Sequence, residues 1–362
     1  MIFFILILAL TAFSSAKAAP AGSFRQDYLS REKTAAVKGI FVVLVFLSHA
    51  RGYFRTGGIW DEAYLAMQDH LGQMVVAMFF FYSGYGMMEQ TRARGYDYVR
   101  SVTSRRLPKL LLDFDTAVVL YLLVNLLRGT RVAPGRFALA LVAWTSLGNS
   151  DWFIFAMLGL YLLCAVAFLP LRRSGSRAVQ AVCLCLLTGL SAGFAAVLMR
   201  CGKPEWWYNT LLLFSAGYWY SFLRPGAERV LMRNDFLYSA AACGTLAVYL
   251  YAFLHRADGF GYYTLWGLCF TALTVLLTMK VSLESNVLRW FGEHVFSIYI
   301  IQRIPMMLLS RVPAFGKHRY MFVIAAFAAT IPSALIFEAL TGKLEKLIWR
   351  QPRASGTART DR

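Results

Sequence analysis

Long apolar blocks alternate with short polar connections along most of the chain. A helix that crosses a bilayer needs roughly 20 predominantly apolar residues. Lipid offers the backbone no hydrogen-bond partner, so blocks of this length must be helices. A shorter segment, 136–147, ends in Ala-Trp-Thr-Ser and is expected to lie in the interface or to re-enter the membrane. The eleven blocks lie near residues 2–16, 39–54, 71–88, 110–127, 152–171, 178–199, 206–223, 236–254, 262–280, 289–310 and 319–341.

Composition supports an all-α integral membrane protein. Of the 362 residues, 58% are hydrophobic and only 15% are charged, whereas a soluble domain usually carries about 25% charged residues. This length would suit two soluble domains, but the apolar blocks exclude that interpretation. The net charge of +18 would suggest a nucleic-acid partner in a soluble protein. Here Lys and Arg cluster in short loops between apolar blocks, as the positive-inside rule expects, so we expect no nucleic-acid partner.

The basic residues also predict an orientation. If residues 17–38 face the cytoplasm, alternate loops face it too, and these segments hold 25 of the 37 Lys and Arg. Six of the 25 lie in the single loop 89–109. The cytoplasmic segments would be 17–38, 89–109, 172–177, 224–233, 280–289 and the part of the chain after residue 341.

The chain divides into three parts. Residues 1–19 form an N-terminal hydrophobic helix, interpreted as an uncleaved anchor. The alternative is a signal peptide cleaved at Ala16-Lys17-Ala18, but no positively charged segment precedes it. Residues 30–345 form one multipass domain without an internal repeat. Residues 350–362 form a polar, basic cytoplasmic tail that is predicted to be disordered.

Cysteine and histidine usage predicts neither a metal site nor a bound cofactor. No pair of the six cysteines forms a CxxC motif, most lie inside apolar blocks, and no His stands at metal-ligand spacing. We therefore interpret the cysteines as small packing residues.

Lys38 and His49 are the most informative ionisable pair. They lie eleven residues apart in the second block, which is three helical turns plus about 20°, so both face one stripe with a rise of about 16 Å between them. Lys38 then sits at the cytoplasmic mouth and His49 past the middle of the membrane. A neutral imidazole there can accept a proton, as a general base must. The alternative is a His near the outer interface that bonds a neighbouring helix.

Other segments carry weaker signals. Ser83 and Gly84 end an aromatic run, where small residues allow close helix packing or local unwinding. Arg106 and Lys109 share a helix face and suit the phosphates of a soluble donor, or they are ordinary positive-inside charges. Trp152 follows Asp151, an expected N-terminal cap.

Two further polar residues lie within apolar blocks. Glu338, in the last block, suits a pair with a basic group. Gln302 must face protein or water rather than lipid.

Taken in order, these segments resemble the acyltransferase-3 family of multipass bacterial membrane enzymes over about residues 30–345. The family pattern of Arg or Lys, ten residues and then His is met by Lys38 and His49. The other matching segments are Phe80-Phe81-Tyr82-Ser83-Gly84, Arg106-Leu107-Pro108-Lys109, Trp152-Phe153-Ile154, Trp207-Tyr208-Asn209-Thr210 and Phe291-Gly292-Glu293-His294-Val295-Phe296-Ser297-Ile298-Tyr299.

There are two departures from the family pattern. Many members have Arg where Lys38 and Lys109 stand, and Lys lacks the bidentate fork, so we expect donor contacts that differ from theirs. Many also have His where Gln302 stands, so no proton-transfer role is assigned to Gln302.

The resemblance implies a fold and a reaction. The fold is about ten core helices around a central cavity, with the first block as an added N-terminal helix. Acyl-CoA, as a co-substrate, would bind from the cytoplasm at Lys38, Arg106 and Lys109, and its acyl group, expected to be acetyl, would pass to a hydroxyl of a carbohydrate or lipid-linked glycan of the cell envelope. His49 would be the base, with possible support from Ser83, Gly84, Trp152 and Glu338. Ser83 and Ser48 are candidate oxyanion donors. The implied location is the bacterial cytoplasmic membrane.

Two other classes remain open from the sequence. A polytopic transporter or flippase of envelope precursors would also have many helices with buried polar residues, but such proteins often show inverted repeats, which are not seen here. A structural membrane scaffold would not need a Lys-His stripe inside the bilayer.

Overall fold

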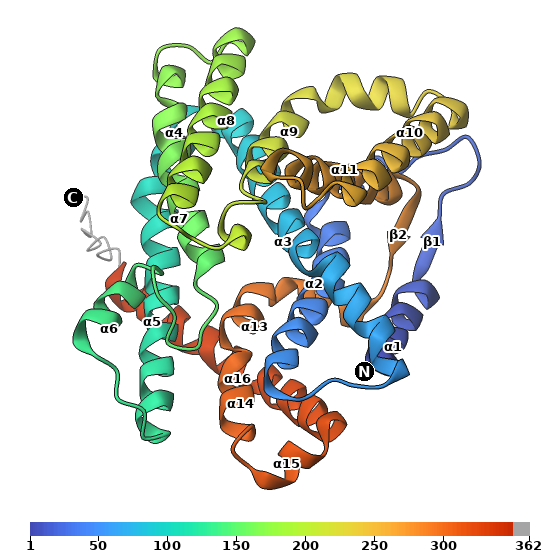
Figure 1. Cartoon of the computed structure of the whole chain (residues 1–362). Coiled ribbons are helices and arrows are strands. Elements are labelled where there is room, and N and C mark those ends of the chain that lie inside the picture. The colour runs from blue at the N-terminus through green and yellow to red at the C-terminus, as the bar shows by residue number, and fades with distance from the viewer. Residues whose placement is uncertain (350–362) are drawn as a thin grey trace, which may run out of the picture.

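A computed structural model describes residues 1–349, apart from the side chains at positions 316 and 317. The tail predicted to be disordered, 350–362, lies outside the described residues. Of the described residues, 79% are helical, and almost none lie in strands (Figure 1). The helices are α1 (Ile2–Ser14), α2 (Arg31–Ala50), α3 (Ile59–Arg94), α4 (Tyr96–Ser101), α5 (Leu107–Leu127), α6 (Pro134–Leu141), α7 (Trp152–Ala167), α8 (Arg177–Arg200), α9 (Leu212–Leu231), α10 (Asp235–Leu254), α11 (Phe260–Lys280), α12 (Asn286–Glu293), α13 (Val295–Ile301), α14 (Arg303–Leu309), α15 (Pro313–Lys317) and α16 (Arg319–Ile348).

Seven helical segments in the described part of the chain are long and apolar enough to cross a membrane. They are Arg31–Tyr53, Ile59–Arg94, Tyr96–Leu127, Arg177–Arg200, Asp235–Leu254, Phe260–Lys280 and Arg319–Ile348. Three shorter apolar helical segments accompany them: Ile2–Ser14, Trp152–Ala167 and Val295–Leu309. The prediction of an all-α protein with several helices that can cross a membrane is confirmed, but the predicted ten core helices are not, because seven segments of the described residues qualify by length and composition.

Each of the eleven predicted blocks lies mostly in helix, but their limits differ from those of the α-helices, and one block is divided most strongly. The block 289–310 is divided into α12, α13 and α14, with breaks at His294 and Gln302. The break matters because Gln302 lies at the point where the broken helix meets α2.

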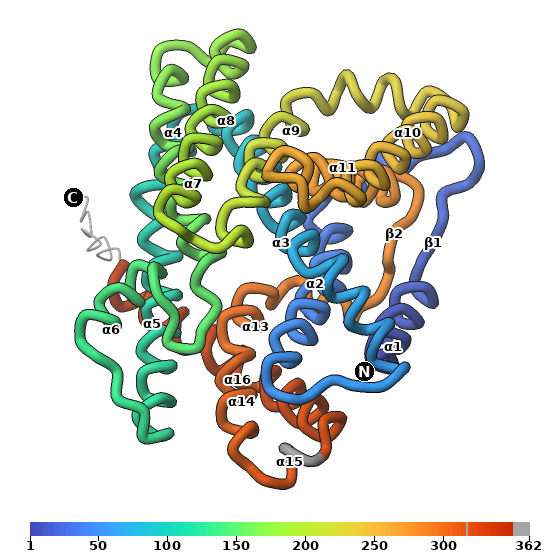
Figure 2. The backbone as a smooth tube through the Cα atoms, viewed as in Figure 1, coloured from blue at the N-terminus to red at the C-terminus, as the bar shows by residue number. Residues whose placement is uncertain are grey.

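Two short strands join distant parts of the chain. β1 (Ala16–Ala18) pairs antiparallel with β2 (Val281–Leu283), which follows α11. Lys17 Nζ lies 2.5 Å from a carboxylate oxygen of Glu284 just beyond β2. Figure 2 shows the two strands side by side, so the segment between α1 and α2 is fixed against the end of α11.

Glycines bring α2 and α12 into backbone contact. A Cβ on Gly39 of α2 would lie 1.9 Å from the carbonyl oxygen of Leu288, and a Cβ on Gly292 of α12 would lie 1.8 Å from that of Ala35. Neither position accommodates a side chain, which fixes α12 and the following α13 against the helix that carries Lys38 and His49.

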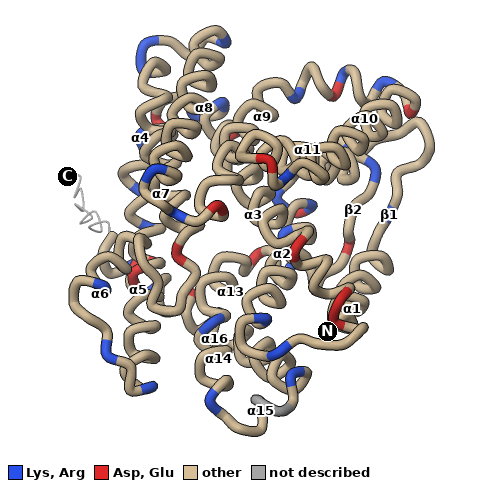
Figure 3. Tube along the Cα trace, in the orientation of Figure 1, with Lys and Arg blue, Asp and Glu red and all other residues tan. Residues whose placement is uncertain are grey.

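Charged residues lie mostly at helix ends and in connections, as Figure 3 shows. Lys38 is different, because it lies within α2 and is half-buried.

Candidate active site

Helix α2 carries a polar stripe toward the middle of the molecule. The Ser30 side chain caps its first turn by accepting a hydrogen bond from the backbone N–H of Lys33. Arg31, Lys38 and His49 follow at intervals close to whole helical turns. The predicted stripe of Lys38 and His49 is present, because Lys38 and His49 line cavities that lie one after the other along α2.

The first cavity, the vestibule, has a volume of about 690 Å³. Its lining includes four basic side chains from three parts of the chain. They are Arg31, Lys38, Arg106 and Arg224. Asp27 and Glu89 also line it, and Arg224 is bound to Glu228 and to the Tyr85 hydroxyl, each at 2.6 Å. Arg31, Lys38 and Arg106 therefore supply most of the positive charge that an anionic ligand would meet.

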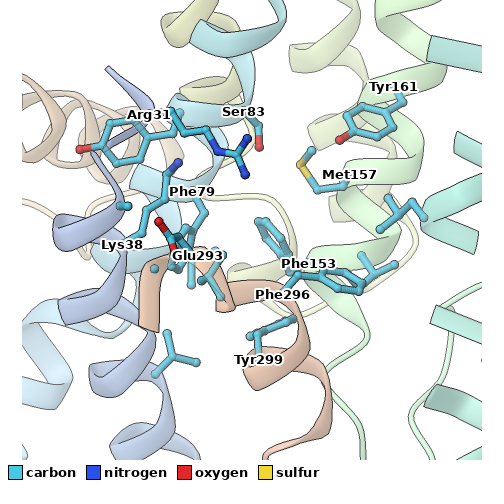
Figure 4. Close-up of a pocket in the computed structure, with 18 residues that line it drawn as sticks. Arg31, Lys38, Phe79, Ser83, Phe153, Met157, Tyr161, Glu293, Phe296 and Tyr299 are labelled. Carbon is cyan, nitrogen blue, oxygen red and sulfur yellow. The ribbon is translucent and has the colours of Figure 1, made fainter. Parts of the chain in front are cut away.

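The second cavity, the apolar chamber, adjoins the vestibule and has a volume of about 380 Å³. The two share Arg31, Lys38, Tyr82 and Ser83. Figure 4 shows Arg31 and Lys38 at one end, Phe296 and Tyr299 at another, and Met157 and Tyr161 on the far side. Most of the remaining lining is apolar: Ala35, Val45, Val76, Phe79, Leu110, Phe153, Ile154, Gly292 and Val295, with Glu293 beside them.

The third cavity, the polar chamber, has a volume of about 310 Å³ and holds His49. It adjoins the apolar chamber, because Val45, Val76 and Tyr299 line both. Its lining combines amide, carboxylate and hydroxyl groups with large aromatic rings. These are Ser48, Gln68, Asp69, Gln73, Trp152, Trp206 and Tyr263.

The His49 imidazole is held by side chains from two other segments. Gln302 Nε2 lies 3.0 Å from His49 Nδ1, and the same Nε2 donates to the Tyr299 carbonyl oxygen at 3.1 Å. On the other side of the ring, Ser150 Oγ lies 3.5 Å from Nε2. Because Gln302 donates to Nδ1, the neutral imidazole in this arrangement carries its proton on Nε2, toward Ser150.

The structure separates the two basic residues that were predicted to act as a pair. Arg106 ends a π-helical segment, Val102–Arg106, and lines the vestibule, with its guanidinium carbon 5.2 Å from the Tyr98 ring centre. Lys109 lines none of the three cavities; its ammonium group pairs with Asp113 and Glu345.

Ser83 and Gly84 have different surroundings although they are neighbours. Ser83 lines both the vestibule and the apolar chamber. A Cβ on Gly84 would lie 2.0 Å from the carbonyl oxygen of Phe214 on α9, so Gly84 serves close helix packing. Helix α3 runs unbroken through both residues, so there is no local unwinding here.

Trp152 and Glu338, which were both expected to support the site, lie in different surroundings. The Asp151 side chain accepts from the Trp152 backbone N–H at 2.9 Å, which confirms the predicted cap, and Trp152 lines the polar chamber. Glu338 accepts hydrogen bonds from His294 Nδ1 and Ser297 Oγ and lines none of the three cavities. Glu338 therefore has the basic partner that was expected, but not beside His49.

Several residues of this site were not predicted from the sequence. Arg31 lies seven positions before Lys38, two turns along the same helix, and that spacing could have identified it. Tyr299 and Gln302 lie three positions apart, on one face of a helix. No local pattern connects either of them with His49, about 250 positions earlier in the chain.

The three cavities form a series. The basic vestibule adjoins the apolar chamber, the apolar chamber adjoins the polar chamber, and His49 lines the polar chamber. Within the described residues, no group of three or more His, Cys, Asp and Glu side chains is arranged to hold a metal ion.

Comparison with known proteins agrees with this arrangement. No curated protein and no solved structure matches the chain significantly. Residues 35–339 match the model of a family described as an acyltransferase domain, which covers most of the chain and favours an enzyme over the transporter considered from the sequence. The chain belongs to the acyltransferase-3 family and is a membrane acyltransferase.

Proposed function

We propose that this enzyme moves an acyl group, acetyl in the simplest case, from cytoplasmic acyl-CoA to a hydroxyl of a carbohydrate or other cell-envelope acceptor. The observation that carries the proposal is the order of the cavities. The vestibule, with its basic side chains, adjoins the apolar chamber, and that chamber adjoins the polar chamber that contains His49.

The vestibule suits the donor. Coenzyme A carries phosphates, which bind best to charged donors such as guanidinium and ammonium groups. Arg31, Lys38 and Arg106 provide these groups. From Lys38 to His49 the helix rises about 16 Å, a span suited to the long, thin arm that carries the thioester through the apolar chamber.

The polar chamber suits a polyhydroxyl acceptor. Trp152, Trp206 and Tyr263 offer flat aromatic faces, and Gln68 and Gln73 offer amides. In the described part of the chain, Gln68 Nε2 and Gln73 Oε1 are buried without a hydrogen-bond partner. Buried polar atoms are normally paired, so these two are available to bind acceptor hydroxyls.

In the proposed reaction, His49 Nε2 removes the proton of the acceptor hydroxyl as its oxygen attacks the thioester carbon. The C–S bond then breaks, and the leaving thiolate takes the proton from the imidazolium. This step needs the neutral tautomer with its proton on Nδ1. After a turn of its amide, Gln302 Oε1 would accept a hydrogen bond from Nδ1–H of His49 and keep the proton on Nδ1; in the described structure Oε1 is buried and has no partner.

The membrane arrangement follows from the same proposal. Besides the seven segments that are long and apolar enough, α7, α9 and the α13–α14 segment would span the membrane to give ten core helices, with α1 as an additional helix. The vestibule would open to the cytoplasm, in the bacterial cytoplasmic membrane that the family resemblance implies.

The test uses membrane vesicles and radiolabelled acetyl-CoA. Inverted vesicles, which expose the cytoplasmic face, should transfer label to envelope glycans, and right-side-out vesicles should not. Mass spectrometry of glycans from cells with and without the gene should identify the acetylated acceptor. If purified enzyme in detergent, supplied with these glycans, consumes no acetyl-CoA, the proposed donor is wrong.

A further inference from the structure

The boundary between the apolar and polar chambers holds one polar side chain. Val45, Val76 and Tyr299 line both cavities, and only Tyr299 can form hydrogen bonds through its side chain. Its hydroxyl oxygen is buried and has no hydrogen-bond partner among the described residues. A buried, unpaired hydroxyl is costly to keep, which calls for an explanation.

Tyr299 is held in a fixed relation to His49. The two ring centres lie 6.1 Å apart, and the Tyr299 ring packs edge-on against Phe153, with centres 5.7 Å apart. Gln302 bonds both the Tyr299 carbonyl oxygen and His49 Nδ1. Ser150 lies close enough to the Tyr299 hydroxyl to interact with it, but the two groups do not meet the distance and angle criteria of a hydrogen bond.

The proposed transfer requires a hydrogen-bond donor at this boundary. As the acceptor oxygen bonds to the thioester carbon, the carbonyl electron pair moves to the carbonyl oxygen, which becomes negatively charged. The thioester comes from the apolar chamber and the acceptor from the polar chamber, so the reacting carbon lies where the two meet. Ser83 lies at the other end of the apolar chamber, where that chamber adjoins the vestibule.

We propose that the Tyr299 hydroxyl donates a hydrogen bond to the thioester oxygen and stabilises the tetrahedral intermediate. This inference rests on the proposed function. Tyr299 keeps its proton throughout. The acceptor proton passes to His49, the new C–O bond forms, and the oxyanion then collapses as the C–S bond breaks. The sulfur leaves with the C–S electron pair and takes the proton from His49.

The direct test is Tyr299→Phe, which keeps the ring and removes only the hydroxyl. Loss of one oxyanion donor lowers kcat by about 10²–10³-fold. The KM for acetyl-CoA should change by less than about twofold, because the bond strengthens only as charge develops. S-ethyl-coenzyme A, a thioether without the carbonyl, should bind the variant and the wild type equally. Equal binding also shows that the donor site of the variant is folded.

Two control variants separate this role from a structural one. Tyr98→Phe removes another buried hydroxyl that lacks a partner in the described structure, but Tyr98 lines none of the three cavities. This variant should keep the wild-type kcat. Ser150→Ala tests whether Tyr299 only positions Ser150. In that case Ser150→Ala and Tyr299→Phe would lower kcat by the same factor, and the double variant would lower kcat no further than either single variant. This result would overturn the proposal.

The remaining outcomes are also distinct. If Tyr299→Phe keeps kcat within about twofold while His49→Ala is inactive, Tyr299 is not the donor and the proposed function stands. If Tyr299→Phe weakens S-ethyl-coenzyme A binding in parallel with kcat, Tyr299 shapes the passage and the proposal is wrong. If wild-type enzyme consumes no acetyl-CoA, the proposed function itself fails.

Discussion

Gln302 Nε2 lies 3.0 Å from His49 Nδ1, and this contact selects the tautomer of the histidine. Gln302 is fully buried, and its Nε2 also donates to the Tyr299 carbonyl oxygen. An amide that donates to Nδ1 leaves the imidazole proton on Nε2, whereas one that accepts from Nδ1 leaves Nε2 free to take a proton. Gln302 is therefore a positioning residue that acts through His49.

Substitutions at Gln302 test this role. Gln302→Leu should lower kcat about tenfold or more, since a buried polar group left unpaired costs about 1–3 kcal/mol. Gln302→Glu should keep kcat well above that of the Leu variant. An ionised carboxylate can only accept hydrogen bonds, so it keeps the imidazole proton of His49 on Nδ1. Steady-state kinetics with acetyl-CoA measures both. Equal and large losses in the two variants would show that Gln302 has a different role.

The vestibule predicts different effects for two neighbouring basic residues. Arg106→Ala should raise the KM for acetyl-CoA about tenfold to a hundredfold, since charge-assisted hydrogen bonds contribute about 1.5–3 kcal/mol. Lys109→Ala is the matched control and should change KM less than about twofold, because Asp113 and Glu345 already pair with Lys109. An unchanged KM in Arg106→Ala would mean that the Arg106 charge serves only the orientation of the protein in the membrane. A raised KM in Lys109→Ala would place Lys109 in the donor site.

Close helix packing at Gly84 predicts a loss of stability. Gly84→Ala would press a Cβ against the Phe214 carbonyl oxygen, and overpacking of this kind typically costs about 1–3 kcal/mol. Gly86→Ala is the control, since a Cβ there meets no atom within 4 Å. Thermal unfolding in detergent should show a lower Tm for Gly84→Ala only. Equal Tm values would mean that α3 and α9 separate readily.

Helical regions were predictable because they depend on local apolar runs, but their limits were less so. The predicted block 206–223 corresponds to α9, which ends at Leu231, past Pro225. An ion pair between Arg224 and Glu228, one turn apart, supports this polar extension, which hydropathy alone does not detect. Hydropathy likewise missed the break at Gln302.

The site was predictable only where its residues share a helix. Lys38 and His49 lie on one helical stripe, so their relation follows from spacing alone. The contact between His49 and Gln302 and the pairing of Lys109 with Glu345 join residues more than 200 positions apart. Such contacts depend on how helices pack, and no sequence period encodes them.

Membrane orientation gives a further prediction. A reporter inserted in the segment 55–58, before α3, should read external, and one fused after Arg94, at the end of α3, should read cytoplasmic, as the basic loops require. The segment 55–58 is preferred to Asp61, because Asp61 is fully buried against Arg319 and the Met1 amine. The reverse pair of signals would place the vestibule outside and remove its access to cytoplasmic acyl-CoA.

Turnover by His49→Gln tests the central claim most directly. Gln keeps a hydrogen-bonding side chain but cannot accept a proton at neutral pH. If His49 is the general base, His49→Gln should therefore lose as much turnover as His49→Ala. General-base catalysis typically contributes about 10²–10⁴-fold. We therefore predict that kcat with acetyl-CoA falls at least about a hundredfold in His49→Gln, while binding of S-ethyl-coenzyme A stays within about twofold of wild type. Near-normal turnover by His49→Gln would contradict the account, because His49 would then serve packing or hydrogen bonding and the base would lie elsewhere.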